Sequence, residues 1–126
     1  GAYSYTLESV LALAYEDSER VLVAATGNNS KCTEGTGCQF YFPAGYPFVL
    51  GVATPANFSN YDNTGPYYST AANSNYELIA PGVDIISTIP NGGYAQLSGT
   101  SMAAPLVAGS VALYNEVKET NNNLVL

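Results

Sequence analysis

A serine in a distinctive setting is the first candidate for chemistry in this chain. Ser101 stands in the stretch Ser98-Gly99-Thr100-Ser101-Met102-Ala103-Ala104-Pro105. A flexible glycine precedes it, and the small apolar residues after it predict a helix that starts at or next to it. At a helix N-terminus the macrodipole favours negative charge, and the first N–H groups lack intrahelical partners. These residue types indicate a nucleophilic hydroxyl whose own N–H can bind an oxyanion.

Asn28 is a second candidate, because it ends the run Val21-Leu22-Val23-Ala24-Ala25-Thr26-Gly27-Asn28. The run from Val21 to Ala25 has no polar alternation, so we predict a strand covered on both faces. An amide fixed at the end of such a strand is a neutral N–H donor, which suits charge that appears only in a transition state. Taken without Ser101, Asn28 is simply a turn residue after a glycine.

Two helices should position these groups. Apolar residues recur at helical spacing from Ser4 to about Asp17, with Ser4 or Thr6 available as the N-cap. A second helix is predicted from Met102 to about Lys118. Small apolar residues cover all faces of its first part, so we expect this part to be buried, with Pro105 near its first turn. Its second part, Asn115 to Glu119, turns polar and should reach the surface.

Strands are predicted between the helices. The buried-type run 48–53 and the short run 77–80, which is stopped by Pro81-Gly82, should join the Val21–Ala25 strand in a sheet. Residues 83–89 and 94–97 flank the turn sequence Pro90-Asn91-Gly92-Gly93 and predict a hairpin. Strands that alternate with helices indicate an α/β fold with a parallel sheet.

The motif around Ser101 resembles the active-site signature of the subtilisin-like serine proteases, the subtilases. The likeness runs from Gly99 to Pro105 and continues through Leu106-Val107-Ala108-Gly109. The strand ending at Asn28 and the segments 42–52 and 79–88 match the same family in the same order. The resemblance implies a parallel-sheet, three-layer subtilisin-like fold, incomplete in this chain, with residues 1–126 as the C-terminal portion of the peptidase domain.

The same resemblance implies a serine endopeptidase that acts on proteins or peptides. Ser101 would be the nucleophile, and Asn28 would supply the side-chain amide of the oxyanion hole. By the family's pattern Ala25, Thr26 and Gly27 form one wall of the pocket for the residue before the cut bond. Tyr41 would be its floor, which predicts a shallow pocket or one lined by a phenol hydroxyl. Alternatively, Tyr41 packs elsewhere because the Cys32–Cys38 loop shifts the register.

The chain departs from the family in one decisive respect, since its sequence contains no histidine. A serine triad needs a base and a carboxylate to orient it, and in subtilases both precede the oxyanion asparagine. Because they are missing as a block, we predict a partial catalytic domain that is inactive alone. Asp62 and Asp84 receive no role, since neither has a base to orient. A non-catalytic module that binds peptides or a protein partner, and a structural piece of an assembly, remain alternative functions.

Composition limits the partners. Ten acids against three bases give a formal net charge of −7, which argues against binding nucleic acid or an anionic membrane surface. No run of apolar residues is long enough to span a membrane. Sheet strands without their neighbours expose an edge, so we expect the N-terminal portion of the protease domain, or an oligomeric partner, beside this chain.

The two cysteines bear on the cellular compartment of the protein and on whether it binds zinc. Cys32 and Cys38 could close a small disulfide loop, which would favour a secreted protein, or remain as two thiols. Two cysteines without histidine cannot fill a usual zinc shell, so we assign no metal ligands. The family implies no required cofactor. Structural calcium is common in it, and its loop sites stay open here.

Overall fold

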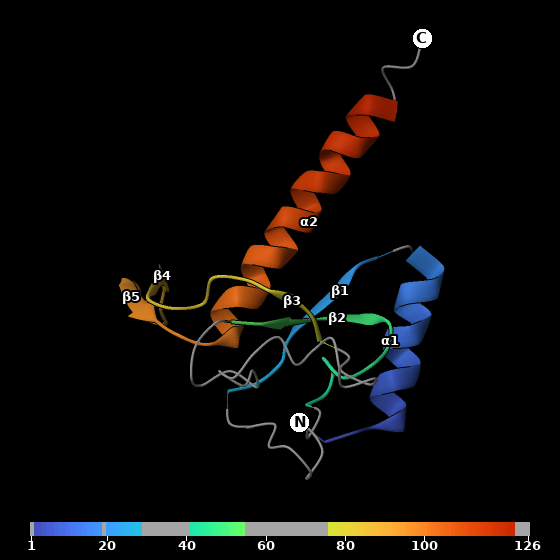
Figure 1. The fold of residues 1–126 in the computed structure, drawn as a ribbon, viewed down its shortest axis with the longest axis horizontal. Helices are drawn as coiled ribbons and strands as arrows, with labels where there is room; N and C mark the ends of the chain where they lie inside the picture. Colours follow the sequence, from blue (N-terminus) through green and yellow to red (C-terminus); the bar gives the residue numbers. More distant parts are fainter. Residues whose placement is uncertain (1, 19, 29–40, 55–75, 123–126) are drawn as a thin grey trace.

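The computed structural model describes residues 2–18, 20–28, 41–54 and 76–122, and it has the predicted α/β architecture (Figure 1). A parallel sheet of three strands is flanked by two helices, and a separate two-stranded hairpin stands beside it. The elements in chain order are α1 (Tyr5–Ser18), β1 (Leu22–Ala25), β2 (Val49–Ala53), β3 (Tyr76–Ile79), β4 (Ile85–Thr88), β5 (Tyr94–Leu97) and α2 (Thr100–Asn122).

The three-stranded sheet has the order β1-β2-β3, and both pairings are parallel. Ala25 at the end of β1 lies opposite Val52, and Ala53 at the end of β2 lies opposite Ile79. The carboxyl ends of all three strands therefore meet at one edge of the sheet, which is where α/β proteins place their ligands.

Helix α2 packs on this sheet through a narrow stripe. Ala103 and Val107 are buried against Val52 and Ala80, at the i, i+4 spacing that puts two residues on one helix face. This small cluster is the core that fixes the start of α2 relative to the strand ends. Partly buried neighbours extend it: Val23, Leu50, Ala104 and Val111.

The prediction that the first part of the serine helix is buried is wrong for this chain. Beyond the Ala103–Val107 stripe, α2 extends away from the sheet (Figure 1). In its first part, Leu106, Leu113 and Tyr114 are 43%, 70% and 67% exposed, whereas the exposure of Val117, at 58%, agrees with the predicted surface position of the second part. Three strands cover only one face of a helix, and within the described residues nothing covers the others. β1 is likewise only half-buried, where cover on both faces was expected.

The predicted hairpin and N-terminal helix are confirmed. β4 and β5 pair antiparallel, with Ile85 opposite Leu97. Of the two predicted N-caps for α1, Ser4 is the one used, since its Oγ accepts the Leu7 N–H at 3.3 Å. Tyr46 ties this cap to the turn before β2, because its hydroxyl donates to the Ser4 carbonyl at 2.7 Å.

Candidate active site

Residues that follow the three strands converge on the first turn of α2. Asn28 follows β1 and binds Thr100. Gly82 follows β3 and accepts the Gly99 N–H on its carbonyl at 2.7 Å. Thr54 follows β2, is fully buried, and lies against Gly82. The strand ends thus hold the residues that immediately precede Ser101.

Asn28 and Thr100 form the most connected part of this site. The Oδ1 of Asn28 accepts from both the N–H and the hydroxyl of Thr100, each at 3.0 Å. The Gly27 N–H donates to the same hydroxyl at 3.1 Å. Thr100 is completely buried, so its hydroxyl accepts one bond and donates another without competition from water. The amide orientation follows: with Oδ1 occupied, the Nδ2 group is the end with donors to spare.

Ser101 lies in the first turn of α2 and is exposed. Asn28 caps the Thr100 N–H, and the Gly99 carbonyl accepts from Met102 at 3.0 Å and from Ala103 at 3.4 Å. No partner among the described residues binds the Ser101 N–H, as is usual for the first turn of a helix. A reachable hydroxyl and an available N–H are therefore combined at the positive end of a helix.

Pro105 sits one turn deeper than predicted. Because α2 begins at Thr100, Pro105 belongs to the second turn. A proline has no N–H to give to the residue four positions earlier, which is Ser101. The Ser101 carbonyl is consequently left without its helical donor.

Two glycines make the close approach around this turn. A Cβ on Gly82 would lie 2.6 Å from the Gly99 carbonyl oxygen and 2.7 Å from the Thr54 Oγ1. A Cβ on Gly99 would lie 3.0 Å from the Asn28 Nδ2. A side chain at Gly82 would clash with the Gly99 backbone, and one at Gly99 would crowd the Asn28 amide, so both close approaches depend on glycine.

The predicted substrate wall lies beside this arrangement. Ala25 is the last residue of β1 and half-buried, while Thr26 is fully buried with its N–H on the Val52 carbonyl at 3.1 Å. Gly27 leads directly into Asn28. Tyr41, the predicted pocket floor, is half-buried at the start of the turn before β2, where its carbonyl accepts the Gly45 N–H at 2.9 Å.

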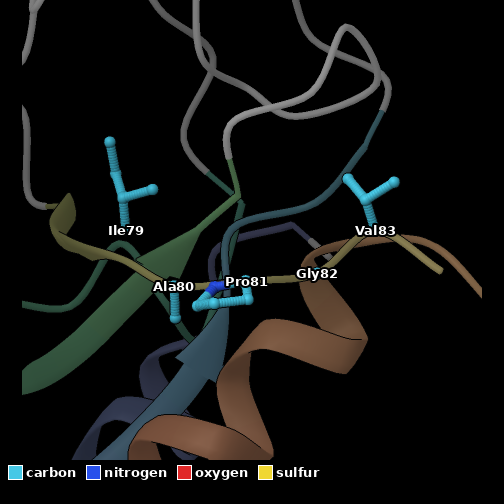
Figure 2. A pocket seen from close by; sticks show the side chains of 5 residues that line it. All are labelled: Ile79, Ala80, Pro81, Gly82 and Val83. Carbon is cyan, nitrogen blue, oxygen red and sulfur yellow. The ribbon is translucent and has the colours of Figure 1, made fainter. Parts of the chain in front are cut away.

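A shallow hollow of about 420 Å³ lies on the segment between β3 and β4, beside the site rather than at Ser101. Figure 2 shows its lining, with the side chains of Ile79 and Val83 pointing to the same side of the backbone. The lining has no charged or hydroxyl side chain, so the hollow has no group for acid–base chemistry. It is formed by Ile79, Ala80, Pro81, Gly82 and Val83.

Metal and membrane features can be assessed only for the described residues. In that part of the chain no three Cys, Asp or Glu side chains gather as a metal site would require. Neither of its helices is long and apolar enough to cross a membrane. Cys32, Cys38 and Asp62 lie outside the described residues.

The roles of four positions that hold the site were missed from the sequence. Thr100 and Gly99 stand inside the recognised motif, but pattern alone does not say that they bind Asn28 and Gly82. Thr54 carries no motif at all, and its hydroxyl has no hydrogen-bond partner in the described structure. The Pro81-Gly82 pair was predicted as a strand stop inside the family-like segment 79–88, and the close approach of the Gly82 backbone to Gly99 was not predicted.

Fold and site together define an α/β protein with a serine at a helix N-terminus and an asparagine bound beside it. Residues 3–124 match the model of the Subtilase family, and the chain belongs to this family. It is 38% identical over 100 residues to an intracellular serine protease of Paenibacillus polymyxa, covering 79% of this chain and 29% of that protein. It is 39% identical over 115 residues to a thermophilic serine proteinase of Bacillus sp. (strain AK1), covering 88% of this chain and 25% of the relative.

A solved structure agrees with these sequence matches. The prenylagaramide maturation protease PagA superposes with a TM-score of 0.73 at 32% identity. The match covers 97% of this chain and 41% of PagA. The chain thus spans about a quarter to two fifths of the proteins it resembles, and it shares the fold of that part.

Proposed function

We propose that this chain supplies the nucleophile and the oxyanion hole of a serine endopeptidase that forms an acyl-enzyme on Ser101. The observation that supports this most is the pair of hydrogen bonds from Thr100 to Asn28, which ties the amide to the residue next to Ser101. Because the Asn28 Oδ1 is occupied, its Nδ2 is left to donate to a substrate oxygen.

In the proposed reaction the Ser101 Oγ bonds to the substrate carbonyl carbon, and the carbonyl oxygen becomes an oxyanion. The Asn28 Nδ2 and the Ser101 N–H donate to that oxyanion as its charge develops. When the intermediate collapses, the carbon–nitrogen bond breaks and the amine leaves with the proton that Ser101 lost. Water then hydrolyses the ester and restores the hydroxyl.

Both proton transfers need a base and a carboxylate that orients it. The 126 residues include no histidine, so we propose that this Asp and His come from a portion of the protease outside them. Without that portion Ser101 is an ordinary alcohol, and we expect the chain alone to retain roughly a thousandfold of catalysis over water at most.

A fluorophosphonate probe tests this proposal on the complete protease. Labelling should occur at Ser101, disappear in Ser101→Ala, and fall strongly in Asn28→Ala. The control is Ser110→Ala, which removes another exposed hydroxyl from the same helix. Saturable binding of peptides with no labelling of Ser101 would instead favour the alternative, a non-catalytic module that binds peptides or a protein partner.

We propose that the exposed face of α2 is covered by the N-terminal portion of the protease domain, or by an oligomeric partner when that portion is missing. The large exposed fractions of Leu113, Tyr114 and Val117 support this, because contiguous apolar patches on a soluble protein mark contact surfaces. Size-exclusion chromatography with light scattering decides. A well-behaved monomer of the 126-residue chain would contradict the proposal.

We propose separately that the protein is extracellular and that the complete protease binds structural calcium. A Cys32–Cys38 disulfide would support secretion, and peptide mapping without reduction would detect it. The name of the Paenibacillus polymyxa relative, an intracellular serine protease, lends secretion no support. For calcium, a lower melting temperature of the complete protease in a chelator, restored by added Ca²⁺, would support a site. No cofactor is proposed for the reaction itself.

A further inference from the structure

Asp84 stands at the base of the hairpin that leads to Ser101. The pairing of Ile85 with Leu97 places it opposite Ser98, at the last position before the strands part. Its backbone φ is 55°, in the left-handed region that residues other than glycine avoid, although Asp and Asn tolerate it best. Such a conformation persists only where surrounding contacts hold it.

Three hydrogen bonds hold it to the strand that runs toward the active site. The Asp84 N–H donates to the Ser98 Oγ at 2.8 Å, and the Ser98 hydroxyl donates back to the Asp84 Oδ1 at 3.4 Å. The Gln96 side-chain amide donates to the Asp84 carbonyl at 3.2 Å. Backbone and side chain of Asp84 are thus both bound to the residues just before Gly99.

The next residue along is held by the same segment. Gly99 follows Ser98, and its N–H donates to the Gly82 carbonyl at 2.7 Å. Residues 82–84 therefore hold residues 98–99 at two adjacent points, directly before α2 begins at Thr100. If the backbone at Ser98 could move, Gly99 and the first turn of the helix, where Ser101 lies, would move with it.

We propose that Asp84 is a positioning residue for Ser101: together with Ser98 it fixes the entry into α2, and so the direction of the nucleophile. The proposal rests on the proposed function of Ser101. It gives Asp84 a role other than that of a triad acid, since its carboxylate accepts from Ser98 and contacts no base among the residues that the structure describes.

The position requires two properties that substitutions can separate. Glycine would accept the left-handed backbone but lacks the side-chain acceptor. Asparagine keeps both the tolerance of positive φ and an Oδ1 acceptor. At the partner position, Ser98→Ala removes the shared hydroxyl, and Ser98→Thr retains it.

These variants are compared in the complete protease by steady-state kinetics and by backbone amide exchange at Asp84, Gly99 and Thr100. In Asp84→Gly and Ser98→Ala, kcat should fall roughly 3- to 10-fold, the range for losing one or two ordinary hydrogen bonds. KM should stay the same, and the three amides should exchange faster. In Asp84→Asn and Ser98→Thr, kcat and the amide exchange rates should both stay within about twofold of the parent values.

The matched control is Ser87→Ala, which removes an exposed hydroxyl from β4 of the same hairpin. If Ser98→Ala behaved like this control in kcat and in exchange, the proposal would be overturned. A rise in KM with unchanged exchange would also overturn it, because the pair would then act on substrate binding. If the parent protease showed no activity at all, the proposed function would fail, and the exchange measurement would still test whether Asp84 and Ser98 fix Gly99.

Discussion

The side-chain carbonyl of Asn28 accepts two hydrogen bonds from Thr100, one from its N–H and one from its hydroxyl, each 3.0 Å long. A residue in the segment that follows β1 is thereby joined to the first residue of the serine helix. The two ends of the Asn28 amide have separate tasks, since Oδ1 holds the helix and Nδ2 is available to a substrate.

Asn28→Asp separates those tasks. The aspartate keeps an oxygen for the two Thr100 donors but replaces the Nδ2 donor with a second, negative oxygen. We expect kcat of the complete protease to fall at least as far as in Asn28→Ala, by roughly 10²- to 10³-fold, while the melting temperature falls less than in Asn28→Ala. Kinetics and thermal unfolding measure the two effects. Full activity of Asn28→Asp would contradict the oxyanion role.

The Thr100 hydroxyl should matter through its bonds and not its shape. Thr100→Val keeps the side-chain volume but leaves the Gly27 N–H without its acceptor. We expect a loss of about 1–3 kcal/mol in the free energy of unfolding, the usual effect of one buried unpaired donor, with lower kcat. Thr100→Ser, which keeps the hydroxyl, should lose less on both measures. Equal behaviour of the two variants would show that the hydroxyl is dispensable.

Gly82 has no room for a side chain. In Gly82→Ala the new methyl would meet the Gly99 carbonyl oxygen at 2.6 Å, so we expect destabilisation of about 1–3 kcal/mol and weaker labelling of Ser101 by the fluorophosphonate probe. Gly109→Ala is the control, because a Cβ there meets nothing within 4 Å and alanine favours a helix by up to about 1 kcal/mol. Chemical denaturation of both variants measures the difference.

The size of Tyr41 should set the residue preferred before the cut bond. If it forms the pocket floor, the parent protease prefers small residues there. We compare kcat/KM for a substrate with Phe before the cut bond with kcat/KM for one with Ala. Tyr41→Gly should raise this ratio by roughly tenfold or more, since filling a pocket with a few additional methylene groups has an effect of this size. A peptide panel reads this out. An unchanged preference would mean that Tyr41 packs elsewhere.

Tyr3 provides a pH-dependent signal near α1. Its hydrogen bond to the Glu8 carboxylate raises the pKa of Tyr3 from 10.0 to about 12. The raised pKa favours the neutral phenol in the folded protein. The resulting stability is fully present below pH 10 and is lost as the pH rises through about 12. The difference in phenolate absorbance between the parent and Tyr3→Phe follows the titration of Tyr3. In Glu8→Gln the pKa of Tyr3 should be lower than in the parent.

The sequence predicted every described strand and helix, because each carries a strong local signal. The apolar run before Asn28, the Pro90–Gly93 turn and the small-residue helix after Ser101 all depend on residues close together in the chain. The active-site motif predicted Ser101 and Asn28 as candidates for the same reason.

What could not be predicted depends on contacts between distant residues. Burial of α2 was expected from its composition, but burial depends on what covers a helix, and three strands cover only one face. The bonds of Thr100 to Asn28 and of Gly99 to Gly82 follow from the sheet register, which no local pattern encodes. Asp84 looked like an acid without a base, and its partner became visible only when the hairpin placed Ser98 opposite it.

The convergence of strand ends on α2 has a consequence for how this protein can change. The hydrogen bonds that join Gly99 and Thr100 to the sheet side of the site come from Gly27, Asn28 and Gly82, which all follow strands at one edge of the sheet. Changes elsewhere in the chain that leave these strand ends intact should therefore keep the nucleophile's support in place, so that new specificities can evolve or be engineered around an unchanged chemical centre.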